Sequence, residues 1–195
     1  MESDDYTVVK VQRYTYPHTI DNGAGERLIF LRTVNGARGD RLEVENVVKP
    51  GSGPPMHIHH FQEEALTVTH GRIAYQRPGE APQFGGPGAT VVFKPGEAHK
   101  FWNPDTDDLR CTGYVEPADN LEYFLTEIYA STKRMGGTRP DPFDAAFLVR
   151  RYRNEFTMVE IPAIVQKIVF PIQVAIGTLL GKYRRYADAP EPVRR

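Results

Sequence analysis

The most constraining feature of this 195-residue chain is a regular alternation of short apolar segments and turn-forming residues from residue 6 to about 116. The segments have the length of strands and are rich in β-branched and aromatic side chains. Glycine- and proline-rich breakers stand between them, such as "DNGAG", "NGARGD" and "KPGSGPP". No helix-period segment interrupts the alternation. The pattern therefore predicts a mainly β domain over residues 1–118, an antiparallel sandwich or barrel.

Two of the apolar segments are long enough to hold two strands each. Residues 65–78 turn near Gly71, and residues 89–103 turn at Pro95-Gly96. We expect each of them to form a hairpin, because glycine and proline favour tight turns. The other expected strands are residues 6–14, 26–34, 41–48 and 109–117.

Composition and charge exclude several classes of protein. Hydrophobic residues make up 40% of the chain and charged residues 25%, which is ordinary for a soluble protein. The formal net charge of −1 provides no overall basic field for binding nucleic acid or acidic membranes. The single cysteine, Cys111, excludes a disulfide within the chain. The start "MESDDYTVVK" is acidic and has no apolar signal core, so we expect a cytoplasmic protein.

Four of the six histidines are concentrated in the stretch "HIHHFQEEALTVTHG", residues 57–71. Alternate residues of a strand share one face, so His57 and His59 are expected to point the same way. A bend must follow near residues 60–62, because an odd number of positions separates His59 from the next inward glutamate.

The apolar residues after the bend decide which of the two glutamates points inward. Glu64, Leu66 and Val68 share one strand face, whereas Glu63 lies on the other with smaller and polar residues. The larger apolar side chains mark the buried face, so Glu64 is expected inside the barrel and Glu63 outside.

The same reasoning places a third histidine in the interior. On the later segment, His99, Phe101 and Asn103 share one face. Three histidines and one glutamate can thus point into one barrel interior. An unpaired carboxylate there would cost several kcal/mol, about the penalty of a buried ion, and a divalent cation would remove that cost. Imidazole with carboxylate suits Fe, Mn, Ni, Cu or Zn. The alternative interpretation is separate core histidines, with both glutamates in solvent.

The spacing of these residues resembles the cupin superfamily. Gly51-x5-His57-x-His59-x4-Glu64-x6-Gly71 is similar to its first motif, position for position. The second motif is matched by Gly88 and by Gly96-x2-His99-x3-Asn103, with Lys94 where the family usually has proline. One copy of each motif is present, as in a single-barrel cupin of the quercetin-dioxygenase-like kind.

The resemblance implies a jelly-roll barrel of at least six antiparallel strands, with a divalent transition metal held by His57, His59, Glu64 and His99. Cupins include dioxygenases, isomerases, epimerases, storage proteins and binding domains. We expect a metal-dependent oxidoreductase of the dioxygenase type, acting on a small oxygen-rich molecule. The alternatives are a cupin isomerase or epimerase and a non-catalytic binding module.

Glu64 is the expected catalytic residue. It is the only anionic group among the four, so it alone could loosen from the metal and accept a proton. His60 and Gln62 are neighbours of the ligands in sequence, and they are candidates for supporting the ligands.

After residue 118 the apolar pattern changes to a helical period, which predicts a helical extension over residues 119–195. Residues 119–137 begin with Asp119 or Asn120 as an N-cap and end at Gly136-Gly137. A second helix is expected to start at Asp141 and Pro142.

The last apolar segment, residues 161–181, has two interpretations. We favour a kinked helix whose stripe packs on the barrel or on a second subunit of a homodimer; the stripe is Ile164, Ile168, Ile172, Ile176 and Leu180. The alternative is a peripheral membrane contact through residues 161–186, which end in the basic and aromatic sequence "KYRRY".

Overall fold

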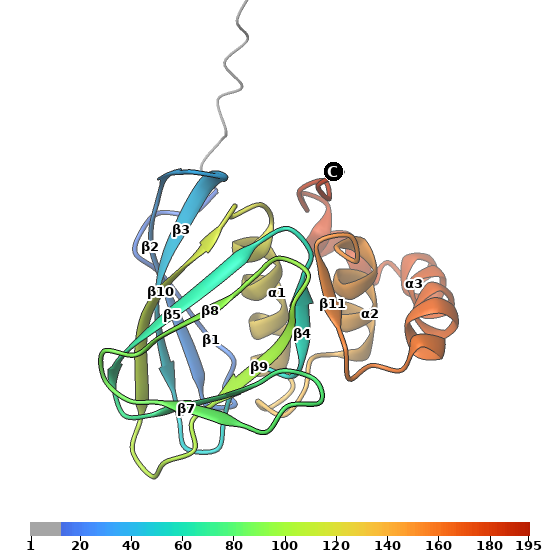
Figure 1. Ribbon diagram of the computed structural model, residues 1–195. Coiled ribbons are helices and arrows are strands. Elements are labelled where there is room, and N and C mark those ends of the chain that lie inside the picture. The colour runs from blue at the N-terminus through green and yellow to red at the C-terminus, as the bar shows by residue number, and fades with distance from the viewer. Residues whose placement is uncertain (1–12) are drawn as a thin grey trace, which may run out of the picture.

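The computed structural model describes residues 13–195, whose strands form two sheets with helices at one side (Figure 1). The six-stranded sheet has the order β1 (His18–Asp21), β2 (Glu26–Gly36), β3 (Gly39–Val48), β10 (Leu109–Glu116), β5 (Glu63–His70) and β8 (Thr90–Phe93). The five-stranded sheet has the order β11 (Phe156–Met158), β4 (His57–His59), β9 (Ala98–Trp102), β6 (Ile73–Gln76) and β7 (Gln83–Gly85).

The main core lies between the two sheets. Leu66, Val68 and Phe93 come from the six-stranded sheet, and Ile73 and Phe101 from the five-stranded one; all are buried. Neighbouring strands pair antiparallel throughout. The expected mainly β, antiparallel fold is confirmed.

The two expected hairpins are wrong. β5 pairs with β10 and β8, whereas β6 pairs with β9 and β7, so the chain changes sheet at Gly71. It changes sheet again at Gly96, between β8 and β9. Both glycines have positive φ values, +76° and +79°, which suits a sharp turn. Crossing over lets the apolar faces of successive strands meet in one core, whereas a flat hairpin would leave one layer of strands uncovered.

The expected strand over residues 6–14 falls mostly on residues 1–12, which lie outside the described residues. The first described strand is β1, which pairs antiparallel with β2.

Two helices follow the last barrel strand. In Figure 1, α1 (Leu121–Arg134) lies against the barrel, and α2 (Pro142–Arg151) lies on the side of α1 that faces away from the barrel. Asp141 caps α2 as expected, since its carboxylate accepts hydrogen bonds from the backbone N–H groups of Phe143 and Asp144. The region after residue 118 is not wholly helical, because β11 adds a strand to β4.

The first turn of α1 is held differently from the expected N-cap. Asn120 occupies the cap position, but its side chain makes no cap hydrogen bond. Its Nδ2 and its backbone N–H donate instead to the fully buried carboxylate of Glu155, at 2.8 and 3.2 Å. The backbone N–H of Val193 donates to the same carboxylate at 2.9 Å. Glu155 thus ties α1, β11 and the C-terminal tail together.

Replacing Glu155 with alanine is expected to lower the free energy of unfolding by about 3 kcal/mol, because two buried donors and one partly buried donor lose their acceptor. Equilibrium urea unfolding measures the change. Glu191→Ala is the control: its carboxylate is 84% exposed, and we expect a loss of about 0.5 kcal/mol or less. Equal losses in the two variants would contradict this role of Glu155.

The last apolar segment forms three short pieces. A π-helical turn, η1 (Val165–Val169), leads into α3 (Phe170–Leu179), and a 3-10 helix, η2 (Lys182–Tyr186), follows. Pro171, which has no N–H to donate to the preceding turn, lies in the first turn of α3, and the chain stays helical from η1 into α3. Between residues 13 and 195, no helix is long and apolar enough to cross a membrane.

The expected packing of the 164–180 stripe on the barrel is wrong. Its five residues are 46–64% exposed in the chain. α3 packs on α2 through other side chains, among them Phe170, and Figure 1 shows it as the helix farthest from the barrel. The π turn shifts the residues that follow it around the helix axis relative to a regular α-helix. Burial of the stripe by a second subunit stays a prediction.

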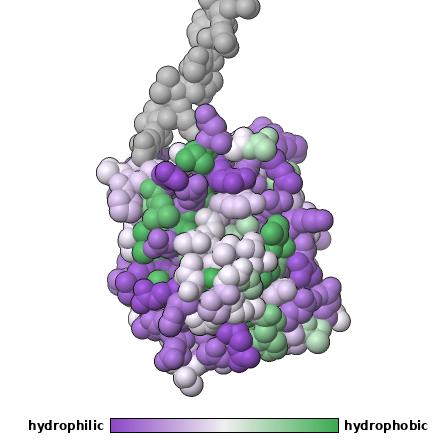
Figure 2. Space-filling view, turned by 60° about the vertical axis from the view of Figure 1, so that its left-hand side comes forward, coloured by the Kyte–Doolittle hydropathy of each residue, from purple (hydrophilic) through white to green (hydrophobic). Residues whose placement is uncertain are grey.

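Figure 2 shows the side that is at the left of Figure 1, where the six-stranded sheet lies. Hydrophilic residues cover most of this face, and the hydrophobic residues lie in separate small groups. This face therefore has the character of an ordinary solvated surface.

Candidate metal centre

The candidate centre is built from three strands of the two facing sheets. His57 and His59 lie on β4 and are buried, with Ile58 on the opposite face. His99 lies on β9 and pairs directly with His57 in the antiparallel ladder. Glu64 reaches the same point from β5 in the other sheet. The structure thus brings together the four residues expected from the sequence.

The ligand atoms of these four side chains lie within 4.8 Å of one another. Glu64 Oε2 is 3.1 Å from His99 Nε2, 3.4 Å from His59 Nε2 and 4.0 Å from His57 Nε2. Two atoms that bind one ion at about 2.1 Å lie about 3.0 Å apart at right angles and about 4.2 Å apart on opposite sides. The spacing therefore fits one transition-metal ion.

Hydrogen bonds to the backbone orient two of the imidazoles toward the centre. His57 Nδ1 lies 2.8 Å from the carbonyl oxygen of Pro55, and His99 Nδ1 lies 2.9 Å from that of Glu97. A carbonyl only accepts, so both Nδ1 atoms carry the proton and both Nε2 atoms present lone pairs to the centre. His57 Nε2 and His59 Nε2 are 3.1 Å apart. A cation between these nitrogens fits the arrangement.

The electrostatics of the centre also favour cation binding. Burial lowers the pKa of His57 to about 3, and the neighbouring His59 and His99 add to the effect. Burial raises the pKa of Glu64, but the close contacts of its carboxylate with His59 and His99 outweigh that effect and hold the pKa well below its usual range. The centre therefore combines a neutral His57 with an ionised carboxylate, which are the forms that bind a metal.

The two adjacent glutamates have separate environments, as expected from strand alternation. Glu63 points away from the centre: its carboxylate accepts a hydrogen bond from Tyr114 Oη at 2.8 Å and pairs with Arg38 at 3.1 Å. Glu64 alone faces the histidines.

The two candidate supporting residues bind elsewhere. His60 Nε2 lies 2.8 Å from Thr157 Oγ1, and Gln62 donates to Asp119 at 3.2 Å. Support for a ligand comes instead from Phe93, whose ring stacks on His99 with centroids 3.9 Å apart. The sequence indicated Phe93 only as core, because nothing in a strand pattern reports which ring it will face.

A cavity of about 390 Å³ opens from the centre toward the helices. His57, His59 and Glu64 line one end of it. Most of the remaining wall is apolar and comes from β2, β3, α1 and α2, including Leu28, Phe30, Val44, Leu121, Phe124, Leu125, Ile128 and Val149. The helices therefore complete the wall, which sequence reasoning did not predict.

Two polar side chains interrupt the apolar wall. Burial raises the pKa of Glu26 to about 7, although hydrogen bonds from Tyr129 and Asn22 oppose the shift. Asn46 is 4% exposed, and its Oδ1 has no hydrogen-bond partner among residues 13–195. Both stand at inward positions of otherwise apolar strand faces, a signal that the sequence does contain. The cavity can therefore hydrogen-bond a polar group on a largely apolar molecule.

Comparison with known families decides what kind of domain holds this centre. Residues 45–114 match the family model described as a cupin domain. The chain contains a cupin domain. The match includes all four site residues and ends within β10, so it leaves out the three α-helices.

Solved structures with a similar fold are cupin-like proteins of different kinds. A conserved double-stranded β-helix protein from Klebsiella pneumoniae subsp. pneumoniae MGH 78578 is 21% identical, covers 60% of this chain and 91% of its own, and has a TM-score of 0.41. A predicted oxalate decarboxylase from Thermotoga maritima is 19% identical over 51% and 90%, with a TM-score of 0.41. KdgF from Halomonas sp. is 17% identical over 53% and 92%, with a TM-score of 0.46. No curated protein matches the sequence significantly.

Proposed function

We propose that this cupin is a metal-dependent oxidoreductase of the dioxygenase type, acting on a small organic molecule that carries neighbouring oxygen atoms on an apolar body. The observation that carries the proposal is the convergence of His57, His59, Glu64 and His99 beside a mainly apolar cavity of about 390 Å³, which the first three of them line. A volume in this range suits one small ligand.

The shape of the cavity supports the assignment of substrate groups. The oxygen atoms would lie at the centre, and the apolar body would lie against side chains of β2, β3 and α1. Asn46 Oδ1 would accept a hydrogen bond from a hydroxyl or amine elsewhere on the molecule. Such a substrate resembles a flavonol, a diketone or an enediol more than a free sugar.

Each group of the centre has a defined role in this proposal. The three histidines and Glu64 would hold the metal, which would supply Lewis-acid polarisation of the substrate oxygens. Glu64 is the only carboxylate among them and accepts the proton of the substrate hydroxyl. The apolar wall excludes water, which strengthens the interaction between charges at the centre. Both atoms of dioxygen end in the product.

An oxygen electrode tests the proposal directly. Protein reconstituted separately with Fe, Mn, Ni, Cu and Zn is mixed with flavonols, diketones and enediols, and oxygen uptake is recorded with product analysis. We expect uptake with at least one metal and one substrate class. Glu64→Gln is expected to reduce the rate by about 100-fold or more, as for loss of a general base, whereas Glu63→Gln should leave it within about twofold.

Other outcomes would assign a different function. Turnover without oxygen uptake would identify an isomerase or epimerase, for which proton transfer by Glu64 suffices. Saturable binding without any product, at full metal loading, would identify a binding module and reject the oxidoreductase.

A further inference from the structure

The helix α3 is apolar on two sides, but residues 13–195 cover only one of them. Phe170 and Val174 pack toward α2, near Ala146 and Val149. On the outward side the apolar side chains are exposed, up to 89% at Leu179, and this outward face consists of Ile164, Ile168, Val169, Ile172, Ile176, Leu179 and Leu180. A helix that is apolar all round needs partners on all sides. Seven large apolar side chains on one segment therefore mark an interaction surface.

The charges within the segment that carries this outward face have one sign, although Glu160 and Asp188 flank the segment and Arg185 pairs with Asp144 of α2 at 3.5 Å. From residue 161 to residue 187 the sequence contains no aspartate or glutamate, but it contains four basic residues: Lys167, Lys182, Arg184 and Arg185. The net charge of −1 for the whole chain conceals this local excess of positive charge. The partner of the face should therefore be apolar inside and anionic at its surface.

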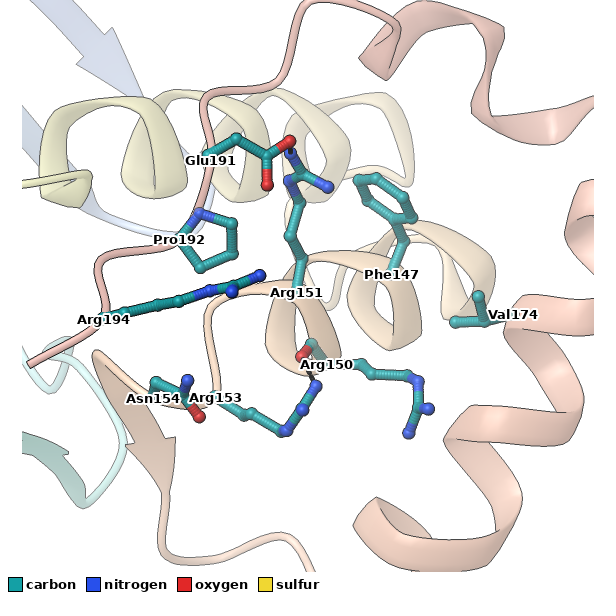
Figure 3. Close-up of a pocket in the computed structure, with 9 residues that line it drawn as sticks. All are labelled: Phe147, Arg150, Arg151, Arg153, Asn154, Val174, Glu191, Pro192 and Arg194. Atoms are coloured by element: carbon teal, nitrogen blue, oxygen red, sulfur yellow. Dashed lines mark hydrogen bonds and ion pairs between the residues drawn. The ribbon is translucent and has the colours of Figure 1, made fainter.

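A pocket of about 410 Å³ beside α3 adds more positive charge (Figure 3). Arg150 and Arg151 at the end of α2, Arg153 just after it and Arg194 of the C-terminal tail line the pocket, with Val174 of α3 at one side. We call the four arginines the arginine pocket.

Among the residues that the structure describes, only one guanidinium of the arginine pocket has a carboxylate partner. Arg151 pairs with Glu191 at 3.0 Å. Within residues 13–195, Arg150, Arg153 and Arg194 form no ion pair. The negative end of the α2 dipole favours basic side chains in the last turn of the helix, which accounts for Arg150 and Arg151. It does not account for Arg194, which comes from a separate segment.

We propose that the outward face of α3 and the arginine pocket dock on the surface of an anionic phospholipid membrane. The apolar side chains enter the interface between headgroups and acyl chains, and the arginines bind the lipid phosphates. The helix lies in the plane of the interface, which agrees with its being too short to span a bilayer. This interaction is independent of the metal centre and of its chemistry.

Charge favours the membrane over a second copy of the chain. Two copies that met through the outward face would bring together segments that carry lysine and arginine and no carboxylate between residues 161 and 187. Like charges at an interface oppose association. An anionic lipid surface instead supplies the missing negative charge, and Lys167 can extend to the headgroups while its neighbours are buried.

Vesicle flotation of the purified full-length protein tests the proposal. Vesicles of phosphatidylglycerol and phosphatidylcholine in equal amounts are compared with vesicles of phosphatidylcholine alone. Flotation is chosen because aggregated protein sinks and bound protein rises. We expect binding to the mixed vesicles that weakens as salt is added, and at least tenfold weaker binding to phosphatidylcholine.

Matched variants separate the two parts of the surface. Arg150→Ser with Arg194→Ser should weaken binding about 30-fold, at about fivefold for each basic residue near an anionic surface. Ile172→Ser with Ile176→Ser should weaken it at least about tenfold, through lost apolar burial. The controls are Phe84→Ser, an exposed apolar residue on β7, and Arg27→Ser with Arg110→Ser on the barrel. They should bind within about threefold of the unmodified protein.

Two results would overturn the proposal. One is failure of the unmodified protein to float with the mixed vesicles at low salt. The other is a dimer in solution that Ile172→Ser with Ile176→Ser converts to a monomer, which would assign the outward face to a second copy. The substituted side chains are exposed, so circular dichroism should show unchanged folding in every variant.

Discussion

His99→Ala is expected to lose affinity for divalent transition metals by about 100-fold or more, measured as metal retained per chain after dialysis. His99 supplies one of four converging ligand atoms, its Nε2 lies 3.1 Å from Glu64 Oε2, and a stacked Phe93 ring holds it in place. An alanine there leaves three ligands and a gap beside a buried carboxylate. The same loss is expected for His57→Ala, His59→Ala and Glu64→Ala.

Glu63→Ala is the control for this prediction. Glu63 is the immediate neighbour of Glu64, but it pairs with Arg38 and Tyr114 on the other face of β5. It should retain the metal content of the unmodified protein. Metal loss in Glu63→Ala together with normal content in Glu64→Ala would show that the carboxylate facing the histidines has been assigned wrongly.

The composition of the centre could be predicted from the sequence because strand alternation is a local property. His57 and His59 share a face at any position in the sheet, and the apolar neighbours of Glu64 select it over Glu63. The same face test placed His99, which lies far along the chain, in the interior, and the spacing of the cupin motifs assigned it to the same site. These steps needed no knowledge of which strands are neighbours.

Strand pairing could not be predicted in the same way. The segments around Gly71 and Gly96 have the local features of hairpins, yet each crosses between sheets. Whether such a segment forms a hairpin or crosses between the sheets depends on how the apolar faces of its two strands are buried in one core, which is a property of the whole domain. The same limit applies to the cavity wall: a helical period can predict an apolar stripe on α1, but not that Phe124 and Ile128 would line the cavity beside the candidate metal centre.

The outward face of α3 illustrates a further limit of the sequence pattern. The spacing of Ile164, Ile168, Ile172, Ile176 and Leu180 predicts one buried apolar stripe, but all five side chains are exposed in the chain. The helical spacing of apolar residues indicates that a surface needs a partner, but it does not identify the partner. The structure excludes the barrel, because α3 is separated from it by α2. The distribution of charge along the segment is then the observation that favours an anionic membrane over a second copy of the chain.

Metal binding is also expected to stabilise the fold by about 4 kcal/mol when free metal exceeds Kd by a thousandfold, since only the folded chain brings the four ligands together. The centre joins β4 and β9 of one sheet to β5 of the other, so the metal would hold the two sheets together. Differential scanning calorimetry with metal and then with excess chelator measures the shift in Tm. For a domain of this size we expect a rise of about 8–16 °C.

His99→Ala provides the matched comparison for this stabilisation. Its Tm should respond little to either metal or chelator, whatever its stability without metal. The control matters because a metal can also bind weakly to exposed carboxylates and shift Tm without entering the barrel. A Tm shift of equal size in the unmodified protein and in His99→Ala would place the stabilising ion outside the centre. A shift present only when all four ligands are intact would place it between the two sheets, at the point where Glu64 meets the three histidines.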